Sequence, residues 1–402
     1  MTLSRSIVRL VIALAVAGGS LGALPGPAWA LSTTPDITWM TNGRLYASVR
    51  LGNTLYVGGT STLVKAEVPG HAYAVSGLAA FDITTGKGIP TWTPLVTNNT
   101  GTPVVHGLAL SPDGAWLYVG GRFDAIDGCA LRNLGRISTA TGQVDPTFAP
   151  QVGNSTSLVY AILTSVDRIY FGGRFSLVSG IRRSKMLAAV DPDGALDPDW
   201  TAVADKTVHS LAFASDGATI FVGGVFTTMD GVPRQSVARV TTDTGALDPW
   251  AIPAGTIVAP QSAWTFAVTP TRLYGGFGYT GPNYLAAFRL DNGSAGDQVW
   301  RFNTVGNVQT VALSPSGTQL YFGGHFGLGQ LQQTVCRHVP LKGLAIANPV
   351  NGQIDCSWVP YLEPNNFEGP WSLVLTDTYL WVAGGFTRIG GIQHRDVARF
   401  TL

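Results

Sequence analysis

Charged side chains are scarce in this 402-residue chain, where Asp, Glu, Lys and Arg together make up 12% of the residues. The formal net charge is +1, so there is no charge excess that would attract nucleic acids or anionic membranes. Apolar residues make up 45%, which excludes an intrinsically disordered chain. Glycine is abundant, with 50 residues, and aromatic residues reach 10%. This composition is typical of short β-strands joined by tight turns.

Motifs of the common catalytic and cofactor sites are also missing. The chain has no nucleophile elbow, P-loop or dinucleotide fingerprint. It has no CxxC or HxxxH spacing that would hold zinc. We therefore expect no cofactor and no metal, and we favour a non-catalytic protein.

Cysteine is rare, with three residues. Cys336 and Cys356 fall within one sequence repeat and form the natural disulfide pair, which an exported protein can keep oxidised. Cys129 would then be a lone thiol. The alternative is three unpaired, buried thiols.

The N-terminus reads as a secretory signal peptide. Arg5 and Arg9 precede an apolar stretch at 10–24, two prolines end it, and Ala28 and Ala30 occupy the −3 and −1 positions of a cleavage site. A membrane anchor is the alternative, but the apolar run is short for a bilayer span. We predict residues 1–30 as a signal peptide cleaved near Ala30. The mature chain would be secreted, extracellular or associated with the cell surface, without a transmembrane segment.

A glycine pair that follows two apolar or aromatic residues recurs along the chain, and a phenylalanine usually stands two positions later. The second glycine falls at positions 59, 121, 173, 224, 276, 324 and 385. Seven copies about fifty residues apart indicate a repeat architecture. The motif in each copy ends a β-rich segment, and glycine pairs there mark a bulge or a close backbone approach.

The second copy shows four β-rich segments, at 105–110, 116–123, 134–138 and 143–148, separated by turn signals such as Thr141-Gly142. Each repeat is thus predicted to be a four-stranded antiparallel sheet. One such sheet cannot bury both faces, whereas seven packed around an axis can. We predict an all-β fold, a seven-bladed β-propeller that forms a single domain over residues 31–402.

The two ends of the chain favour a closed ring over an open array. Residues 37–39 resemble the fourth segment of a repeat, and the last copy stops after its third segment at 397–400. An N-terminal strand that pairs with the C-terminal blade would remove the last open edge. An open array would instead need capping repeats.

The full motif resembles the delta-sixty repeat family of bacterial β-propellers. The pattern is GG-x-F-x-x-x-x-G, then Arg, then a short strand, then Leu-Asp-Pro and an aromatic residue. The third copy carries it at Gly172, Gly173, Phe175, Gly180, Arg183 and 196–200, and the fourth at 223–226, Gly231, Arg234 and 247–250. The resemblance covers nearly all of residues 37–402 and implies the propeller fold. The fifth copy departs from it, because its loop after Phe277 is short and lacks the arginine.

Aligned first segments place one column of bulky residues side by side, followed by a column of small ones. The bulky column, our candidate binding site, is Tyr46, His106, Tyr160, His209, Trp264, Gln309 and Trp371. The innermost strand of a propeller lines its channel, so these side chains would form an aromatic, hydrogen-bonding cup at the mouth. Aromatic faces with hydrogen-bonding groups suit sugars and peptides. The alternative is that these residues pack between blades.

Two functions remain compatible with this sequence. The favoured one is an exported, non-catalytic and monomeric propeller that binds a protein or a cell-surface glycan through its channel mouth and loops. The alternative is a carbohydrate-active hydrolase or lyase, which would need two converging carboxylates. The column contains none, and the nearby acids are Glu363 and Glu368, in an insertion at 360–370 that could cover the mouth.

Overall fold

The computed structural model describes residues 31–67, 70–182, 186–258, 260–327, 336, 341–364 and 368–402. The predicted signal peptide at 1–30, its cleavage site at Ala30, and Arg183 of the repeat motif lie outside these residues. The described residues form β-strands and connecting turns without a helix, so the all-β class is confirmed. Over the same ranges, no helical segment has the length and apolar character to span a membrane.

Seven of the antiparallel sheets each contain one strand that carries the glycine motif, and this strand lies between the first and third strands of its sheet. We number these sheets first to seventh in chain order. Their strands are β2 (Leu45–Leu51), β3 (Thr54–Gly59) and β6 (Leu78–Asp82); β8 (Val104–Leu110), β9 (Trp116–Arg122) and β12 (Leu134–Ser138); β13 (Leu158–Thr164), β14 (Ile169–Arg174) and β17 (Leu187–Val190); β18 (Val208–Phe213), β19 (Thr219–Gly224) and β22 (Val237–Thr241); β23 (Ser262–Val268), β24 (Arg272–Gly278), β25 (Asn283–Arg289) and β26 (Gln298–Thr304); β27 (Val308–Leu313), β28 (Leu320–Gly324) and β29 (Leu344–Ala347); and β31 (Pro370–Leu375), β32 (Tyr379–Gly384) and β35 (Val397–Thr401).

The predicted fourth strand is complete only in the fifth of these sheets, where β26 pairs with β25. In the second sheet the fourth segment makes a single bridge, from Val144 to Ile137 of the third strand. The reason lies in the Asp-Pro step that follows, because proline cannot donate to the ladder and Asp145 folds back to accept the backbone N–H of Thr147 at 2.9 Å. In the sixth copy Cys356 replaces the proline, but Asp355 folds back in the same way onto the N–H of Ser357, and Ile354 again makes one bridge, to Ala347. In the fifth copy Gln298 stands in this position and β26 continues to Thr304.

Shorter strands form small side sheets, mostly from the loop that follows the second strand of a sheet. They are β1 (Met40–Thr41), β4 (Leu63–Lys65) and β5 (Ala72–Ala74); β7 (Val96–Thr97), β10 (Ala125–Ile126) and β11 (Cys129–Ala130); β15 (Leu177–Val178) and β16 (Ile181–Arg182); β20 (Thr228–Met229) and β21 (Val232–Pro233); and β30 (Leu362–Pro364), β33 (Phe386–Ile389) and β34 (Ile392–Gln393). The glycine of the Phe-x-x-x-x-Gly motif makes the hairpin turn, as Gly128 does at a φ of 79°.

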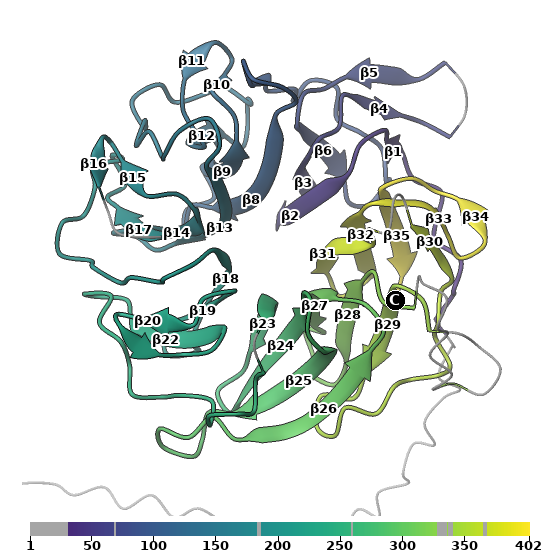
Figure 1. Cartoon of the computed structure of the whole chain (residues 1–402). Coiled ribbons are helices and arrows are strands. Elements are labelled where there is room, and N and C mark those ends of the chain that lie inside the picture. Colours follow the sequence, from purple (N-terminus) through teal and green to yellow (C-terminus); the bar gives the residue numbers. More distant parts are fainter. Residues whose placement is uncertain are drawn as a thin grey trace, which may run out of the picture. The chain divides into compact units, whose positions relative to one another are not determined.

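Within the described residues the hydrophobic core forms seven clusters, and each joins two consecutive sheets. One of them joins the last sheet to the first, with Trp381 and Val397 against Leu45 and Val57. The first strands also contact one another in sequence, β2 with β8, β8 with β13, β13 with β18, β18 with β23, β23 with β27, β27 with β31, and β31 with β2. In Figure 1 the sheets follow one another in chain order, each with its first strand nearest the middle of the picture.

The segment before the first sheet lies against the last one. The backbone N–H of Asp36 donates to the carbonyl of Arg399 at 2.7 Å, and the two residues form an antiparallel bridge. The hydroxyl of Thr38 lies 3.1 Å from Nε2 of His394, and the Trp358 indole donates to the carbonyl of Ser32 at 2.9 Å. The expected pairing of the N-terminal segment with the last sheet is therefore present as one bridge and not as a longer strand.

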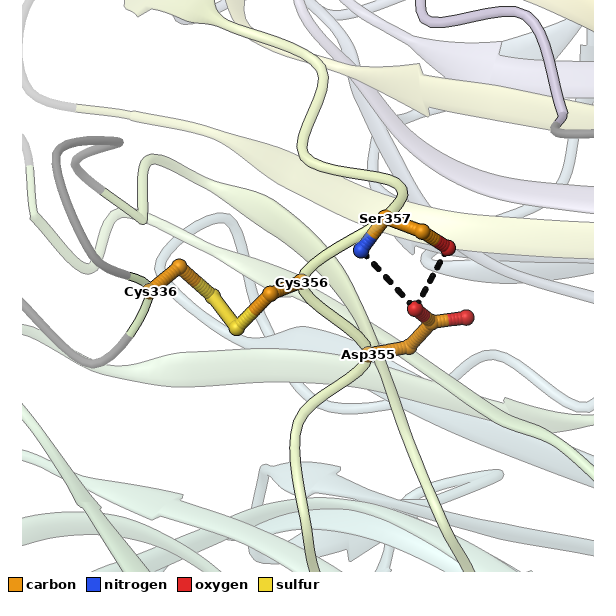
Figure 2. The surroundings of a disulfide bond; sticks show 4 residues. All are labelled: Cys336, Asp355, Cys356 and Ser357. Carbon is orange, nitrogen blue, oxygen red and sulfur yellow. Dashed lines mark hydrogen bonds between the residues drawn. A yellow bond between two sulfur atoms is a disulfide. The ribbon is translucent and has the colours of Figure 1, made fainter.

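Cys336 and Cys356 form the predicted disulfide, and Cys129 is free and partly buried. Figure 2 shows the bond beside Asp355, whose carboxylate accepts the backbone N–H of Ser357 at 2.9 Å and its hydroxyl at 2.6 Å. Cys356 occupies the place that proline takes in the Asp-Pro step of other copies. The disulfide thus ties the fourth segment of the sixth repeat to the loop after its second strand.

Candidate binding site on the first strands

Every first strand of the seven sheets contains a bulge, a residue skipped by the ladder with the second strand. In β8, for example, Val105 pairs with Gly121 and Gly107 pairs with Gly120, so His106 has no partner in the register. The skipped residues are Tyr46, His106, Tyr160, His209, Trp264, Gln309 and Trp371. These are the seven residues of the predicted column, so the structure gives them one common backbone setting.

In six of the seven sheets a glycine of the second strand pairs with the residue just before the bulge. A Cβ atom on Gly121 would overlap the carbonyl oxygen of Val104, and one on Gly59 would overlap that of Arg44. The missing side chain lets the first strand approach closely, and the strand bends to leave one residue outside the ladder. The repeat motif therefore positions the column from the neighbouring strand.

Two copies differ from the alignment of the glycine pairs. In the fifth sheet Ala263 pairs with Phe277, and in the seventh Pro370 pairs with Gly384. The residue that pairs just before the bulge is therefore Phe277 in the fifth sheet and Gly384 in the seventh, not Gly276 and Gly385 as the alignment of the glycine pairs suggested. The fifth sheet thus forms its bulge with a phenylalanine at this position.

Six of the seven side chains carry rings, and these rings form a continuous series of contacts that we call the aromatic layer. The centroid distances are 4.1 Å for Tyr46–His106, 4.9 Å for His106–Tyr160, 4.8 Å for Tyr160–His209, 4.2 Å for His209–Trp264, 5.7 Å for Trp264–Trp371 and 5.5 Å for Tyr46–Trp371. The expected open cup is therefore partly filled by its own side chains. All six residues are partly exposed when backbone and side chain are taken together, and none belongs to the seven core clusters.

Gln309, the seventh residue of the column, is buried, with 5% of its surface exposed. Its strand lies between those of Trp264 and Trp371, whose indoles meet edge to face at 5.7 Å. The Oε1 atom of Gln309 has no hydrogen-bond partner among the described residues. A buried acceptor without a protein partner is uncommon in proteins.

A cavity of about 210 Å³ adjoins the layer. Five of the rings line it, together with the small residues that follow the bulges, such as Ala47, Gly107 and Ser210. The column of small residues thus leaves space beside the rings. A larger cavity of about 460 Å³ lies elsewhere, around Arg234 and Ile257, and contains none of the predicted site residues.

The two histidines of the layer are neutral at neutral pH. Burial lowers the pKa of His106 to about 3, with further contributions from His209 and Arg122. Burial also lowers the pKa of His209 to about 3, and its Nδ1 lies 2.7 Å from the hydroxyl of Ser262. Tyr160 lies between the two imidazoles and contacts both. Among the described residues no cluster of three His, Cys, Asp or Glu side chains could hold a metal.

One acidic residue reaches the aromatic layer. Glu368 accepts the indole N–H of Trp371 at 2.8 Å and forms an ion pair of 2.8 Å with Arg44. Glu363, the other acid of the insertion, lies on β30 and pairs with Arg388 of β33 at 3.7 Å. The two carboxylates therefore have different partners. Residues 365–367 of the insertion lie outside the described residues.

The sequence analysis missed the residues that follow the glycine pairs. Arg122 and Arg174 stand there, at the ends of β9 and β14, and the ladder pairs them with the residues two positions before His106 and Tyr160. Their signal was present in the motif, because position 122 follows Gly121 directly. It becomes informative only when the pairing register shows which strand faces which.

Comparisons with known proteins bear on the fold. No protein-family model and no curated protein matches the chain. The solved structure of U3-55K is similar, with a TM-score of 0.57 and 11% sequence identity, over 92% of this chain and 99% of that chain. At this identity the likeness shows a shared fold. Because 866 chains of solved structures match, the fold is common and does not carry a function by itself.

Proposed function

We propose that the chain is a closed, seven-bladed β-propeller of the delta-sixty repeat type. Seven core clusters that each join consecutive sheets support this architecture, and the cluster between the last and first sheets supports closure. The contact of Asp36 with Arg399 supports a ring joined at its ends. A closed ring removes the exposed sheet edges that an open array would leave.

The protein is exported and stays outside the cytoplasm or at the cell surface. The disulfide between Cys336 and Cys356 supports this location, because such bonds persist in oxidising compartments. A signal peptide at residues 1–30 would provide the route. Fractionation of cells that express the full chain, with mass analysis of the mature N-terminus, tests both points.

The aromatic layer binds a glycan of the cell surface. The observation that carries this function is the placement of six partly exposed ring-bearing residues at the bulges, outside all seven core clusters, with five of them lining a cavity. Aromatic residues without a part in the core are available for a ligand. Sugar rings stack their C–H faces on such side chains, while the imidazoles that line the cavity offer hydrogen bonds.

Binding is better supported than catalysis at this site. A glycoside hydrolase needs two carboxylates that converge on one bond. Glu368 reaches the layer, whereas Glu363 is paired with Arg388. A protein partner would bind the same layer. The glycan array described next distinguishes a protein ligand from a glycan ligand.

A glycan array with the purified full-length protein tests the function, followed by calorimetric titration of the best oligosaccharide. Trp264→Ala should weaken binding about tenfold or more, as expected for an aromatic anchor. Tyr361→Ala, an exposed aromatic outside the layer, is the matched control and should bind as the wild type does. Unchanged affinity for Trp264→Ala contradicts the site. An array without any signal, together with capture of a protein, contradicts a glycan ligand.

A further inference from the structure

Two arginines stand beside one side of the aromatic layer. Arg122 and Arg174 belong to neighbouring sheets and pair with Val104 and Leu158, which lie just before the bulges of His106 and Tyr160. Arg174 is exposed and Arg122 is partly exposed. A terminal nitrogen of Arg174 donates to the carbonyl of Thr156 at 2.9 Å, which holds its side chain over the loop that leads into β13.

The charges of these arginines act on the rings. Burial raises the pKa of the Tyr160 hydroxyl, and both Arg174 and Arg122 oppose this rise. Arg122 also contributes to the lowered pKa of His106. The strand register places both arginines two ladder positions before the bulges of His106 and Tyr160, in agreement with these effects.

Neither arginine is neutralised by an ion pair within the part of the chain that the structure describes. The third arginine near the layer, Arg44, is already paired with Glu368. Asp124, two residues after Arg122, accepts the backbone N–H of Asn99 at 2.9 Å. The layer therefore has two uncompensated positive charges on one side, while its histidines add none.

We infer that the ligand of the aromatic layer is an acidic glycan, whose sugar carboxylates face Arg122 and Arg174 while its rings stack on the neighbouring side chains. This inference rests on the proposed glycan-binding function and specifies its ligand class. Guanidinium groups bind carboxylates through paired, charge-assisted hydrogen bonds, which gives specificity for the anion. A neutral glycan would stack on the rings but would form no ion pair with Arg122 or Arg174.

The test compares a uronic acid oligosaccharide with its carboxyl-reduced, neutral counterpart, and with a polyol phosphate oligomer of similar length. Calorimetry on the full-length protein should give about tenfold or higher affinity for the uronic acid form than for the neutral form. This preference should shrink as salt is raised, because it depends on charge.

The double variant Arg122→Gln with Arg174→Gln should lose the preference and still bind the neutral oligosaccharide as the wild type does, which also shows that it is folded. Arg50→Gln is the matched control. Arg50 is an exposed arginine that also donates to a backbone carbonyl, but it lies near the C-terminal end of β2, away from the bulge at Tyr46. It should keep the preference.

Each remaining outcome overturns a defined statement. Equal affinity of the wild-type protein for the acidic and neutral forms overturns the acidic ligand and leaves glycan binding intact. If the protein binds the polyol phosphate and does not bind the uronic acid form, the inference that the anionic group of the ligand is a carboxylate is wrong. No binding of any of the three overturns the proposed function together with this inference.

Discussion

The guanidinium group of Arg399 lies 2.8 Å from the carboxylate of Asp36, 363 residues away in the sequence. Arg399 is on the last strand, and Asp36 precedes the first sheet. The same unit recurs inside other sheets, where Arg136 pairs with Asp145 at 2.7 Å and Arg239 with Asp248 at 2.6 Å. Asp36 thus forms, in the last sheet, the ion pair with a third-strand arginine that the aspartate of the Asp-Pro step forms in other sheets.

The Arg399 ion pair should contribute strongly to stability, because the arginine is largely buried and also donates to the carbonyls of Ile83 and Thr84. Arg399→Gln should lower the free energy of unfolding by about 2 kcal/mol. The control Arg388→Gln removes an exposed pair and should cost less than about 0.5 kcal/mol. Urea unfolding of both variants measures the difference, and equal losses would show that the contact between the chain ends is not specially stabilising.

Gly121→Ala tests the origin of the bulges. The new methyl group would overlap the Val104 carbonyl, which belongs to the backbone and cannot rotate away. We expect a loss of about 3 kcal/mol in unfolding free energy, together with weaker ligand binding as His106 moves. Gly135→Ala in the same sheet meets flexible side chains of Leu131 and Ile126 and should cost about 1 kcal/mol or less. If the two variants are equally stable, the bulge does not depend on the glycine.

His106 and His209 should remain neutral down to low pH, since burial lowers the pKa of each to about 3. Between the ordinary pKa of 6.5 and 3 the unfolded chain binds more protons, so these groups make stability fall as the pH falls. Imidazole NMR signals of both residues should not titrate above pH 5. Titration of either signal near pH 6.5 would contradict the burial of that imidazole.

Asp396→Asn should stabilise the protein above pH 7. Asp396 is buried, its Oδ2 atom has no partner among the described residues, and burial raises its pKa to about 7. The folded state binds the extra proton between the ordinary pKa of 3.8 and 7, so this group costs stability as the pH rises through that range.

Asn133 holds the corresponding place in the second sheet, with a φ of 63° against 65° for Asp396. Its amide donates to the carbonyls of Val152 and Asn154 at 2.7 and 3.0 Å, which shows what an amide can do there. The gain for Asp396→Asn should be about 1–2 kcal/mol at pH 8 and vanish near pH 4. Urea unfolding at both pH values checks this, and a less stable variant at pH 8 would contradict it.

Much of the architecture was readable from local signals. The glycine pairs located the second strands, the Cys336–Cys356 pair was inferred from its place within one repeat, and the all-β class followed from composition and turn residues. The column of seven residues was also predicted, because each first segment carries a bulky residue followed by a small one, and the ladder skips that bulky position in all seven sheets. Repetition makes each copy evidence for the others, which is why these predictions were available from one sequence.

The rest depended on contacts between residues far apart in the chain. The rings of the column fill part of their own cup because Trp371 reaches Trp264 across the strand of Gln309, and no spacing encodes such a contact. The nearness of Arg122 and Arg174 to the layer follows from strand register, and the Arg399–Asp36 pair from packing of the two chain ends. Sequence periodicity determines which backbone positions are equivalent, whereas side-chain packing decides which of them share one surface.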